Sequence, residues 1–513
     1  MRRPAADDGG RAREILTVGH PLLHRRAAPV AADDPELAGE IADLAATLTE
    51  FRRQHGFGRG LAAPQVGISK RLIVLDLEAG PLPLINPEIT WRSTETFSLW
   101  DDCLSVPDRI ARVRRHRSIS LHYDDAARRR RHWRHLPADL AELLQHEIDH
   151  LDGILMIDRI AGPEDLAPLT ERARYIGPQR RQPRITAPGI RQATELVDPV
   201  FADSPQWQCE ALGEELGVRL TFKVETLNPI RCFKGRGASV LVTHHKADQG
   251  RRPLAAASAG NWGQALAYCG RRAEIPITVW AAETANPLKV ERMRQLGAEV
   301  RIAGRDFDAA KEEGRRLAAA EGMRFVEDGL EPEVTAGHGS MAIELFSWAD
   351  AMDDPLDALF VPLGNGAMLA GLACWSKAVS PSTRVVGVAA AGAPAMHDSW
   401  HLPAGSPLVE SARVETIADG LGVRVPIPEA VADLRDIVDD VVLVDDREIA
   451  RAMAQIHRHA GLVTEPAGAA GLAAIAAAPS LAGEHVATVI CGSNLDPAQR
   501  PLLADNDETP PKR

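Results

Sequence analysis

The chain has 513 residues, a formal net charge of −12 at pH 7, 45% hydrophobic residues and 25% charged residues. These proportions are ordinary for a soluble globular protein, and the length allows two to four domains. The acidic balance, together with an aromatic content of only 4%, argues against a protein that coats nucleic acid or an anionic membrane.

The cysteines and the two ends of the chain bear on its compartment. Six cysteines lie at positions 103, 209, 232, 269, 374 and 491, without a C-x-x-C pair, so we expect reduced thiols. Residues 1–14 are charged and lack the apolar run of a signal peptide, and no stretch approaches the ~18 apolar residues of a membrane span. We therefore expect a cytoplasmic protein with no membrane partner, and disordered tails at 1–14 and 504–513.

The first predicted helix covers 36–51, where Leu37, Ile41, Leu44 and Leu48 recur at helical spacing. It is followed by the run Gly58-Arg59-Gly60-Leu61-Ala62-Ala63-Pro64-Gln65. The small residues let the backbone approach a partner closely, and Gln65 then offers an amide donor. Alone, this motif favours a simple tight turn into a strand at 71–77.

The next motif is Asp101-Asp102-Cys103-Leu104-Ser105, which we predict to be a loop. A single cysteine is usually a small core residue. Runs at 119–123 and 131–136 predict a hairpin, and the arginines at 128–131 between them indicate a solvated turn rather than a nucleic-acid patch.

A helix beginning near Leu136 carries Gln145-His146-Glu147-Ile148-Asp149-His150-Leu151-Asp152-Gly153. His146 and His150 are four residues apart, so both rings leave one helix face and could bind one metal ion. Glu147 would lie beside that metal, where a carboxylate can take a proton from bound water. With Cys103 as third ligand, a tetrahedral ion keeps one position open for water. The alternative is a solvated helix that carries these residues by chance.

Together, G-x-G-x-A-A-x-Q, C-L-S and Q-H-E-x-x-H-L-D-G resemble the peptide deformylase family over about 15–160. The resemblance implies a compact α+β domain over 15–165. It implies a metal, natively Fe²⁺ and often replaced by Zn²⁺ or Ni²⁺, held by Cys103, His146 and His150. Glu147 would be the general acid/base, and Gln65 with the backbone N–H of Leu104 would stabilise the oxyanion of the attacked formyl group.

One departure from the family concerns the substrate. The family usually has Glu-Gly before Cys-Leu-Ser, whereas this chain has Asp101-Asp102. An extra carboxylate near the metal could change which substrate enters, so both an N-formylmethionyl peptide and a formylated small molecule remain open. A zinc peptidase is a third possibility, but Cys103 and the Gln65 motif favour deformylation.

A Pro- and Arg-rich stretch over 166–193 is predicted to be a linker. After it comes Phe233-Lys234-Gly235-Arg236-Gly237-Ala238. A single lysine is usually a surface residue. A lysine at an apolar turn can also form a Schiff base.

The second half alternates helical and strand-like segments, which predicts βαβ units and parallel sheets. The predicted helices are 265–272, 290–296 and 368–375, and the predicted strands are 275–280, 299–302, 359–363, 385–390 and 486–490. Gly364-Asn365-Gly366-Ala367 lies between a strand and a helix, as a phosphate-binding turn does.

Residues 194–503 resemble fold-type II pyridoxal-phosphate enzymes of the threonine/serine dehydratase branch. The motifs that carry this resemblance are F-K-G-R-G-A, S-A-G-N-x-G-Q, G-N-G-A, E-P-A-G-A-A and C-G-S-N, in that order. It implies an α/β fold of two parallel or mixed-sheet subdomains, with pyridoxal 5′-phosphate as cofactor. It also implies the following roles: Lys234 is the Schiff-base lysine, Phe233 packs on the ring, Asn261 bonds the ring 3-hydroxyl, Gly364, Asn365, Gly366 and Ala367 cradle the phosphate, and Cys491 faces the pyridine nitrogen.

Two departures leave the amino-acid substrate open. Trp262 stands where dehydratases often have His, and Gly337-His338-Gly339-Ser340 replaces Gly-Gln-Gly-Thr. We expect both to lie near the substrate. A neutral Cys491 thiol at the ring nitrogen suits β-elimination or β-replacement better than transamination.

The sequence thus predicts a multidomain, bifunctional protein: a metal-dependent deformylase-type hydrolase fused to a pyridoxal-phosphate-dependent lyase. The alternative is that only one half is catalytic and the other is a binding or scaffold module. The expected partners are a formylated peptide or small molecule, an amino-acid substrate, and a second copy bound through the C-terminal half. No direct nucleic-acid contact is expected, although a deformylase could act near the ribosome.

Overall fold

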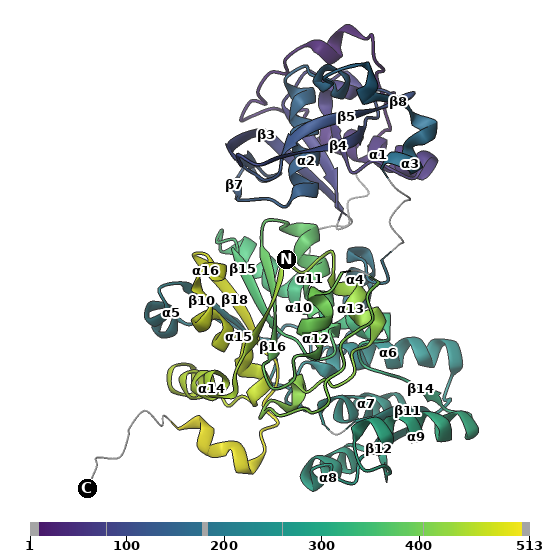
Figure 1. The fold of residues 1–513 in the computed structure, drawn as a ribbon, viewed down its shortest axis with the longest axis vertical. Helices are drawn as coiled ribbons and strands as arrows, with labels where there is room; N and C mark the ends of the chain where they lie inside the picture. The colour runs from purple at the N-terminus through teal and green to yellow at the C-terminus, as the bar shows by residue number, and fades with distance from the viewer. Residues whose placement is uncertain (1–9, 78–79, 177–182, 259, 404, 505–513) are drawn as a thin grey trace. The chain divides into compact units, whose positions relative to one another are not determined.

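The computed structural model describes residues 10–77, 80–176, 183–258, 260–403 and 405–504. The chain divides into two compact units, drawn in Figure 1. The first comprises Met1–Gln182 with the short segment Ala378–Ser382, and the second comprises Pro183–Lys377 with Thr383–Arg513. Each unit has its own sheets and core.

The first unit contains two antiparallel sheets. Their strand orders are β1-β2-β3-β6-β7 and β4-β5-β8. The strands are β1 (Gly60–Ala62), β2 (Leu72–Asp76), β3 (Pro81–Arg92), β4 (Thr96–Asp102), β5 (Arg109–His116), β6 (Ile119–Asp124), β7 (Arg130–Trp133) and β8 (Leu166–Pro168). The β6–β7 pair confirms the predicted hairpin, whereas β1 was not predicted.

Two long helices cover the two faces of the five-stranded sheet. Successive side chains of β2 point to opposite faces, so Leu72 and Val74 pack with α1 (Leu37–His55), while Ile73 and Leu75 pack with α2 (Ala138–Leu151). Helix α2 begins directly after Pro137, whose extended backbone is typical of the residue that precedes a helix. The shorter helices are η1 (Pro21–His24), η2 (Ala63–Val66), η3 (Met156–Arg159), η4 (Pro163–Asp165), η5 (Leu169–Glu171) and α3 (Arg172–Tyr175).

The second unit contains two sheets that are parallel except at one edge. The larger has the order β17-β16-β15-β18-β10-β9, in which β9 alone runs antiparallel to its neighbour, and the smaller has the order β13-β12-β11-β14. The strands are β9 (Gln206–Gln208), β10 (Arg219–Val224), β11 (Leu254–Ala257), β12 (Ile277–Ala281), β13 (Glu299–Ile302), β14 (Arg324–Phe325), β15 (Ala358–Pro362), β16 (Arg384–Ala390), β17 (Asp440–Val444) and β18 (His485–Ile490).

Helices surround both of these sheets, as Figure 1 shows for α7, α8 and α9 around the smaller one. The helices are α4 (Ala187–Thr194), α5 (Glu210–Leu216), α6 (Lys234–Gln249), α7 (Asn261–Ala273), α8 (Pro287–Leu296), α9 (Phe307–Ala320), α10 (Pro332–Ala351), α11 (Ala367–Val379), α12 (Ala395–His401), α13 (Pro428–Leu434), α14 (Asp446–Ala460), α15 (Pro466–Ala477) and α16 (Pro479–Ala482), with η6 (Asp419–Leu421) and η7 (Pro497–Leu503). The predicted fold class, an α+β domain followed by an α/β domain with parallel and mixed sheets, is confirmed.

The structure corrects two segment predictions. Residues 10–14, predicted as part of a disordered tail, run along α1: Arg13 pairs with Asp43 and donates its backbone N–H to Thr47. Residues 1–9 and 505–513 lie outside the described part of the chain. Both ends of the predicted linker are folded, because β8 pairs with β5 and α4 packs on α10.

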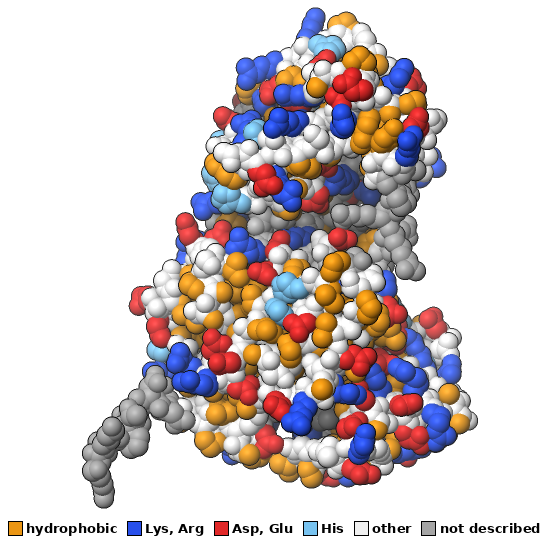
Figure 2. Space-filling model, viewed as in Figure 1, with side chains coloured by type: hydrophobic (Ala, Val, Ile, Leu, Met, Phe, Trp, Pro, Cys, Tyr) orange, Lys and Arg blue, Asp and Glu red, His pale blue; other side chains and the backbone are white. Residues whose placement is uncertain are grey.

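Within the described residues, no helix combines the length and apolar character that crossing a bilayer requires. On the face drawn in Figure 2, basic and acidic side chains are interspersed over each unit. That face therefore presents no large field of one sign to nucleic acid.

Candidate functional site

The first site joins the loop after β4 to α2. The Sγ atom of Cys103 lies 3.3 Å from Nε2 of His150, and the two Nε2 atoms of His146 and His150 are 3.2 Å apart. All three ligand atoms lie within 4.8 Å of one another, and all three residues are buried. The prediction that these residues come together is met, although they are 47 positions apart at the extremes.

Asp101 orients the ring of His146 through its Nδ1 atom, which leaves Nε2 free to bind a metal. Its Oδ2 lies 2.9 Å from Nδ1 of His146, and the same carboxylate accepts from Arg115 at 3.2 Å. Burial by itself lowers the pKa of His146, but the Asp101 carboxylate raises it above its ordinary value. Burial lowers the pKa of His150, which keeps that ring neutral, the form that binds a metal.

The neighbouring Asp102 has a different role from the one we predicted. We expected an extra carboxylate near the metal, but its Oδ2 pairs with Nε of Arg172 on α3 at 2.5 Å. The Arg172 guanidinium in turn stacks 4.8 Å from the ring centroid of Phe57. The carboxylate that reaches the ligands is therefore Asp101, whose side chain is 7% exposed.

Glu147 lies in the same buried space. Burial raises its pKa to about 7, and its Oε2 has no hydrogen-bond partner among the described residues. A Cβ added at Gly60 would lie 2.5 Å from Oε1 of Glu147, so a larger residue there would displace this carboxylate. The first sequence motif thus packs directly against the helix motif.

Two hydrogen-bond donors, the Gln65 side chain and the backbone N–H of Leu104, belong to the surroundings of Cys103. Gln65 is 1% exposed; its Oε1 accepts from the Ala62 N–H at 2.8 Å, which aims its Nε2 at Ser105 Oγ (3.2 Å) and Cys103 Sγ (3.9 Å). The Leu104 N–H donates to no acceptor within the described ranges. Both groups are available to a developing negative charge beside Cys103.

Sequence reasoning missed a charged pair next to this site. Arg59, between the two glycines of the first motif, pairs with Glu142, one turn before His146 on α2. Burial raises the pKa of Glu142 to about 7, and the charges of both residues act on Glu147. Glu142 and His146 are four residues apart and therefore share one helix face, so the sequence alone could have indicated that Glu142 lies near the site.

The three candidate ligands, Cys103, His146 and His150, fit a metal ion. One thiolate-type sulfur and two imidazole nitrogens converge, and a carboxylate holds one ring from the far side, as in transition-metal sites with an open position. Cys103, His146 and His150 would hold the ion.

Replacing Asp101 with Asn is expected to weaken metal binding by about 10- to 100-fold, because the ring of His146 loses its anionic partner. Competition with a chromogenic chelator measures this. Asp102→Asn is the matched control: its carboxylate pairs with Arg172, so its metal affinity should stay within about twofold. Equal effects of the two changes would contradict the assignment.

The second site is a cavity of about 880 Å³ in the second unit. Lys234, the first residue of α6, lies in it, with Nζ 4.5 Å from the ring centroid of Phe233. The cavity is at the carboxyl ends of parallel strands, where open α/β sheets bind ligands. The predicted residues that line it are Phe233, Lys234, Asn261, Gly364, Asn365, Gly366 and Cys491.

The turn after β15 fits a phosphate. Gly366 has φ +101°, and a Cβ at Gly364 would lie 2.6 Å from the Gly420 carbonyl oxygen, so side chains are excluded at both positions. The turn opens α11, whose N-terminus favours an anion. Ala367 differs from the prediction: it is not among the lining residues, and its N–H donates to Oδ1 of Asn365 at 3.3 Å.

Asn261 and Cys491 both line this cavity. Asn261 donates to Oε1 of Glu465 at 2.7 Å and accepts from Asn494 at 2.7 Å, so its orientation is fixed. Burial raises the pKa of the Cys491 thiol, which keeps it neutral. Burial also raises the pKa of Glu465 to about 7.

Of the two departures predicted near the substrate, the structure places one in the cavity. Trp262 lines it. His338 is fully buried, meets the Phe233 ring edge-on at 4.7 Å, and has a pKa lowered by burial to about 3. Ser340 accepts from Arg236. His338 and Ser340 thus contact Phe233 and Arg236, which lie within two residues of Lys234 in the chain.

Two acidic residues of this cavity were missed. Glu465 opens the motif E-P-A-G-A-A, but its carboxylate was not assigned a role. Asp328 pairs with Lys234 and follows β14 by three residues. Asp328 lies in no motif and is 94 positions from Lys234 in the chain, so the sequence did not indicate that the two residues pair.

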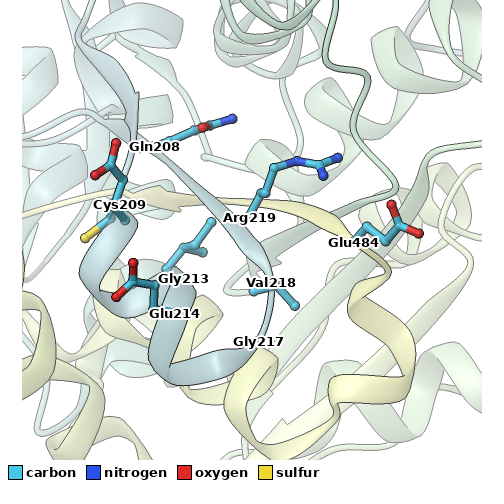
Figure 3. Close-up of a pocket in the computed structure, with 10 residues that line it drawn as sticks. Gln208, Cys209, Gly213, Glu214, Gly217, Val218, Arg219 and Glu484 are labelled. Atoms are coloured by element: carbon cyan, nitrogen blue, oxygen red, sulfur yellow. The ribbon is translucent and has the colours of Figure 1, made fainter.

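A further cavity, of about 450 Å³, lies beside α5, β10 and the residue before β18. Figure 3 shows its lining residues, among them Cys209, Glu214, Arg219 and Glu484. It shares no lining residue with the Lys234 cavity.

The two sites define the class: one chain combines a domain with a deformylase-type Cys/His/His metal site and an α/β domain with a buried lysine opposite a glycine-rich turn. The chain belongs to the family of pyridoxal-phosphate dependent enzymes, whose model matches residues 197–492, and its N-terminal part is a polypeptide deformylase domain, matched over 12–165.

The second unit resembles several characterised proteins. It is 35% identical over 285 residues to an L-threonine ammonia-lyase of Geobacter sulfurreducens, covering 55% of this chain and 69% of that protein. It is 32% identical over 296 residues to a biosynthetic L-threonine dehydratase of Pasteurella multocida, covering 57% of this chain but only 56% of that protein. The chain thus spans less than two thirds of the length of some relatives.

Solved structures of related enzymes are also similar to this part of the chain. The processed form of threonine deaminase isoform 2 from Solanum lycopersicum matches with a TM-score of 0.56 at 27% identity, covering 62% of this chain and 93% of that one. Maize serine racemase matches with a TM-score of 0.57 at 25% identity, covering 61% and 95%.

Proposed function

We propose that the chain is a bifunctional enzyme, with a metal-dependent deformylase over 15–165 and a pyridoxal-phosphate-dependent lyase over 194–503. The observation that carries the first half is the convergence of Cys103, His146 and His150 beside the unpartnered Glu147 carboxylate. The observation that carries the second is the cavity that joins Lys234 to the glycine-rich turn.

In the first half, a divalent metal such as Fe²⁺, Zn²⁺ or Ni²⁺ would polarise and help deprotonate a water molecule. Glu147 takes the proton of that water and returns one to the leaving nitrogen when the formyl C–N bond breaks. Gln65 Nε2 and the Leu104 N–H donate to the formyl oxygen as it becomes negative. The products are formate and a free amine.

The Arg59–Glu142 pair favours a polar formylated substrate. Both residues act electrostatically on Glu147, so this charged pair lies close to the proposed general acid/base. A formylated small molecule, whose free amine then serves the second half, is consistent with such a pair. Competition between an N-formyl amino acid and an N-formylmethionyl peptide tests this, and strong preference for the peptide would contradict it.

In the second half, pyridoxal 5′-phosphate supplies the electron sink for bond cleavage at the α-carbon of an amino acid. Lys234 would hold the cofactor covalently and move the α-proton. Gly364, Asn365, Gly366 and Ala367 would hold the phosphate at the start of α11. Asn261 would bind the ring 3-hydroxyl, Phe233 would pack on the ring, and the neutral Cys491 thiol would face the ring nitrogen.

The neutral thiol favours β-elimination or β-replacement, and similarity to threonine dehydratases makes L-threonine and L-serine the first substrates to assay. Release of ammonia and a 2-oxo acid from either one would support elimination. The competing proposal is that one half only binds. A chain that releases formate but neither of those products, with every amino acid tried, would favour it. We further propose a cytoplasmic homodimer joined through the second unit, without direct nucleic-acid contact.

A further inference from the structure

Arg59 and Glu142 are the charged pair beside the first site. Glu142 lies four residues before His146 on α2, so it extends the helix face that carries the metal ligands by one turn. The Glu142 side chain is 13% exposed, whereas the Arg59 side chain is 45% exposed. A nearly buried carboxylate thus anchors a guanidinium that solvent still reaches.

The guanidinium of Arg59 keeps donors for a second anion. Nη2 donates to Oε1 of Glu142, and both Nη atoms lie 3.5 Å from the carbonyl oxygen of Asp139. Nε donates to no acceptor in the described part of the chain. Because a guanidinium has more donors than one carboxylate uses, Arg59 can bind a further carboxylate without releasing Glu142.

The pair lies near the general acid/base of the proposed hydrolysis. The Cβ position of Gly60, which follows Arg59 in the chain, is 2.5 Å from Oε1 of Glu147. The charges of Arg59 and Glu142 are both near enough to act on the Glu147 carboxylate. Since Glu147 returns a proton to the leaving nitrogen, the group attached to that nitrogen lies on the same side of the site as the pair.

We propose that Arg59 binds a carboxylate next to the formylated nitrogen, so that the substrate of the first half is an N-formyl amino acid with a free α-carboxylate. This inference rests on the proposed deformylase function. One carbon atom separates the α-carboxylate from the leaving nitrogen, which keeps the carboxylate on the Glu147 side. In a formyl peptide the same position is a neutral amide, which offers Arg59 no charge.

The reaction itself is a hydrolysis. The formyl C–N bond breaks, the hydroxyl of water joins the formyl carbon, and a proton goes to the nitrogen. The products are formate and a free amino acid, the class of molecule on which the second half is proposed to act.

The test compares N-formyl-L-alanine with N-formyl-L-alaninamide by formate release from the full-length protein loaded with Ni²⁺. The two probes have nearly the same shape and differ by one negative charge. The wild type should favour the acid in kcat/KM by at least about tenfold, the worth of a charge-assisted hydrogen bond. Arg59→Gln should remove this preference by raising KM for the acid about tenfold at unchanged kcat, because the carboxylate takes no part in the bond cleavage.

Binding without turnover gives a second measurement. In a Glu147→Gln background, Arg59→Gln should raise the calorimetric dissociation constant of the acid about tenfold and leave that of the amide unchanged. Arg53→Gln is the matched control, because Arg53 pairs with Glu50 at the surface of α1 in the same unit. Its preference for the acid should stay within about twofold of wild type.

Three results would overturn the proposal: equal kcat/KM for acid and amide, a preference for the acid that survives Arg59→Gln, or formate release from N-formylmethionylalanine but not from the acid. A metal-loaded wild type that releases formate from neither probe nor from this peptide would instead refute the deformylase function itself.

Discussion

Lys234→Ala is expected to abolish the lyase activity, with a loss of at least about 10³-fold in kcat, because Lys234 is the residue that we propose to hold the cofactor covalently and to move the α-proton. The cofactor absorption band that borohydride reduces should disappear as well. Ammonia release and absorption spectra of the purified variant measure the two effects.

The chain supplies two controls for this result. Lys246 lies on the same helix, α6, and is exposed, so Lys246→Ala should keep the band and the activity. Formate release by the first half should be unchanged in Lys234→Ala, because the deformylase site has its own core and ligands. A Lys234→Ala protein that still eliminates ammonia would place the chemistry elsewhere.

Glu147→Gln is expected to lower the rate of formate release by about 10²- to 10⁴-fold, the usual contribution of a general acid/base. Glutamine keeps the shape of the side chain but cannot take a proton from water. Metal content should stay at the wild-type level, since the ligands are Cys103, His146 and His150. Formate assays with metal analysis on the same preparation separate the two effects.

Glu50→Gln serves as control for Glu147→Gln. Glu50 lies on α1 and pairs with Arg53 at the surface, so its replacement should leave formate release within about twofold. Loss of metal together with activity in Glu147→Gln would mean that Glu147 acts structurally or as a ligand, contrary to our assignment.

The architecture could be predicted where hydrophobic periodicity was strong. The alternation of β11 to β13 with α7 and α8 followed from apolar runs of the right length, and α2 from its apolar face. The short strands β1 and β8 were not predicted, because three residues are too few to show the alternation of a strand. Whether such a segment forms a strand depends on the strand it pairs with, which is distant in sequence. Residues 10–14 were wrongly predicted to be disordered, because local composition does not show that they bind Asp43 on α1.

The sites could be predicted where a motif places its residues close together. His146, Glu147 and His150 lie within one and a half helical turns, so their meeting followed from spacing alone. Asp101, Glu142 and Asp328 were harder to assign. A carboxylate near a ligand can either orient it, as Asp101 does, or pair with a distant arginine, as Asp102 does with Arg172. Only the packing of β4 and α3 decides between these outcomes.

The central claim is that both sites can be loaded in one chain, and one measurement on the purified full-length protein tests it: an absorption spectrum before and after borohydride, together with metal analysis. We expect about one metal ion per chain and a band near ~410–420 nm that is lost on reduction, with the label on Lys234. A colourless protein that holds metal but takes up no pyridoxal phosphate would contradict the account and leave a deformylase with an appended domain.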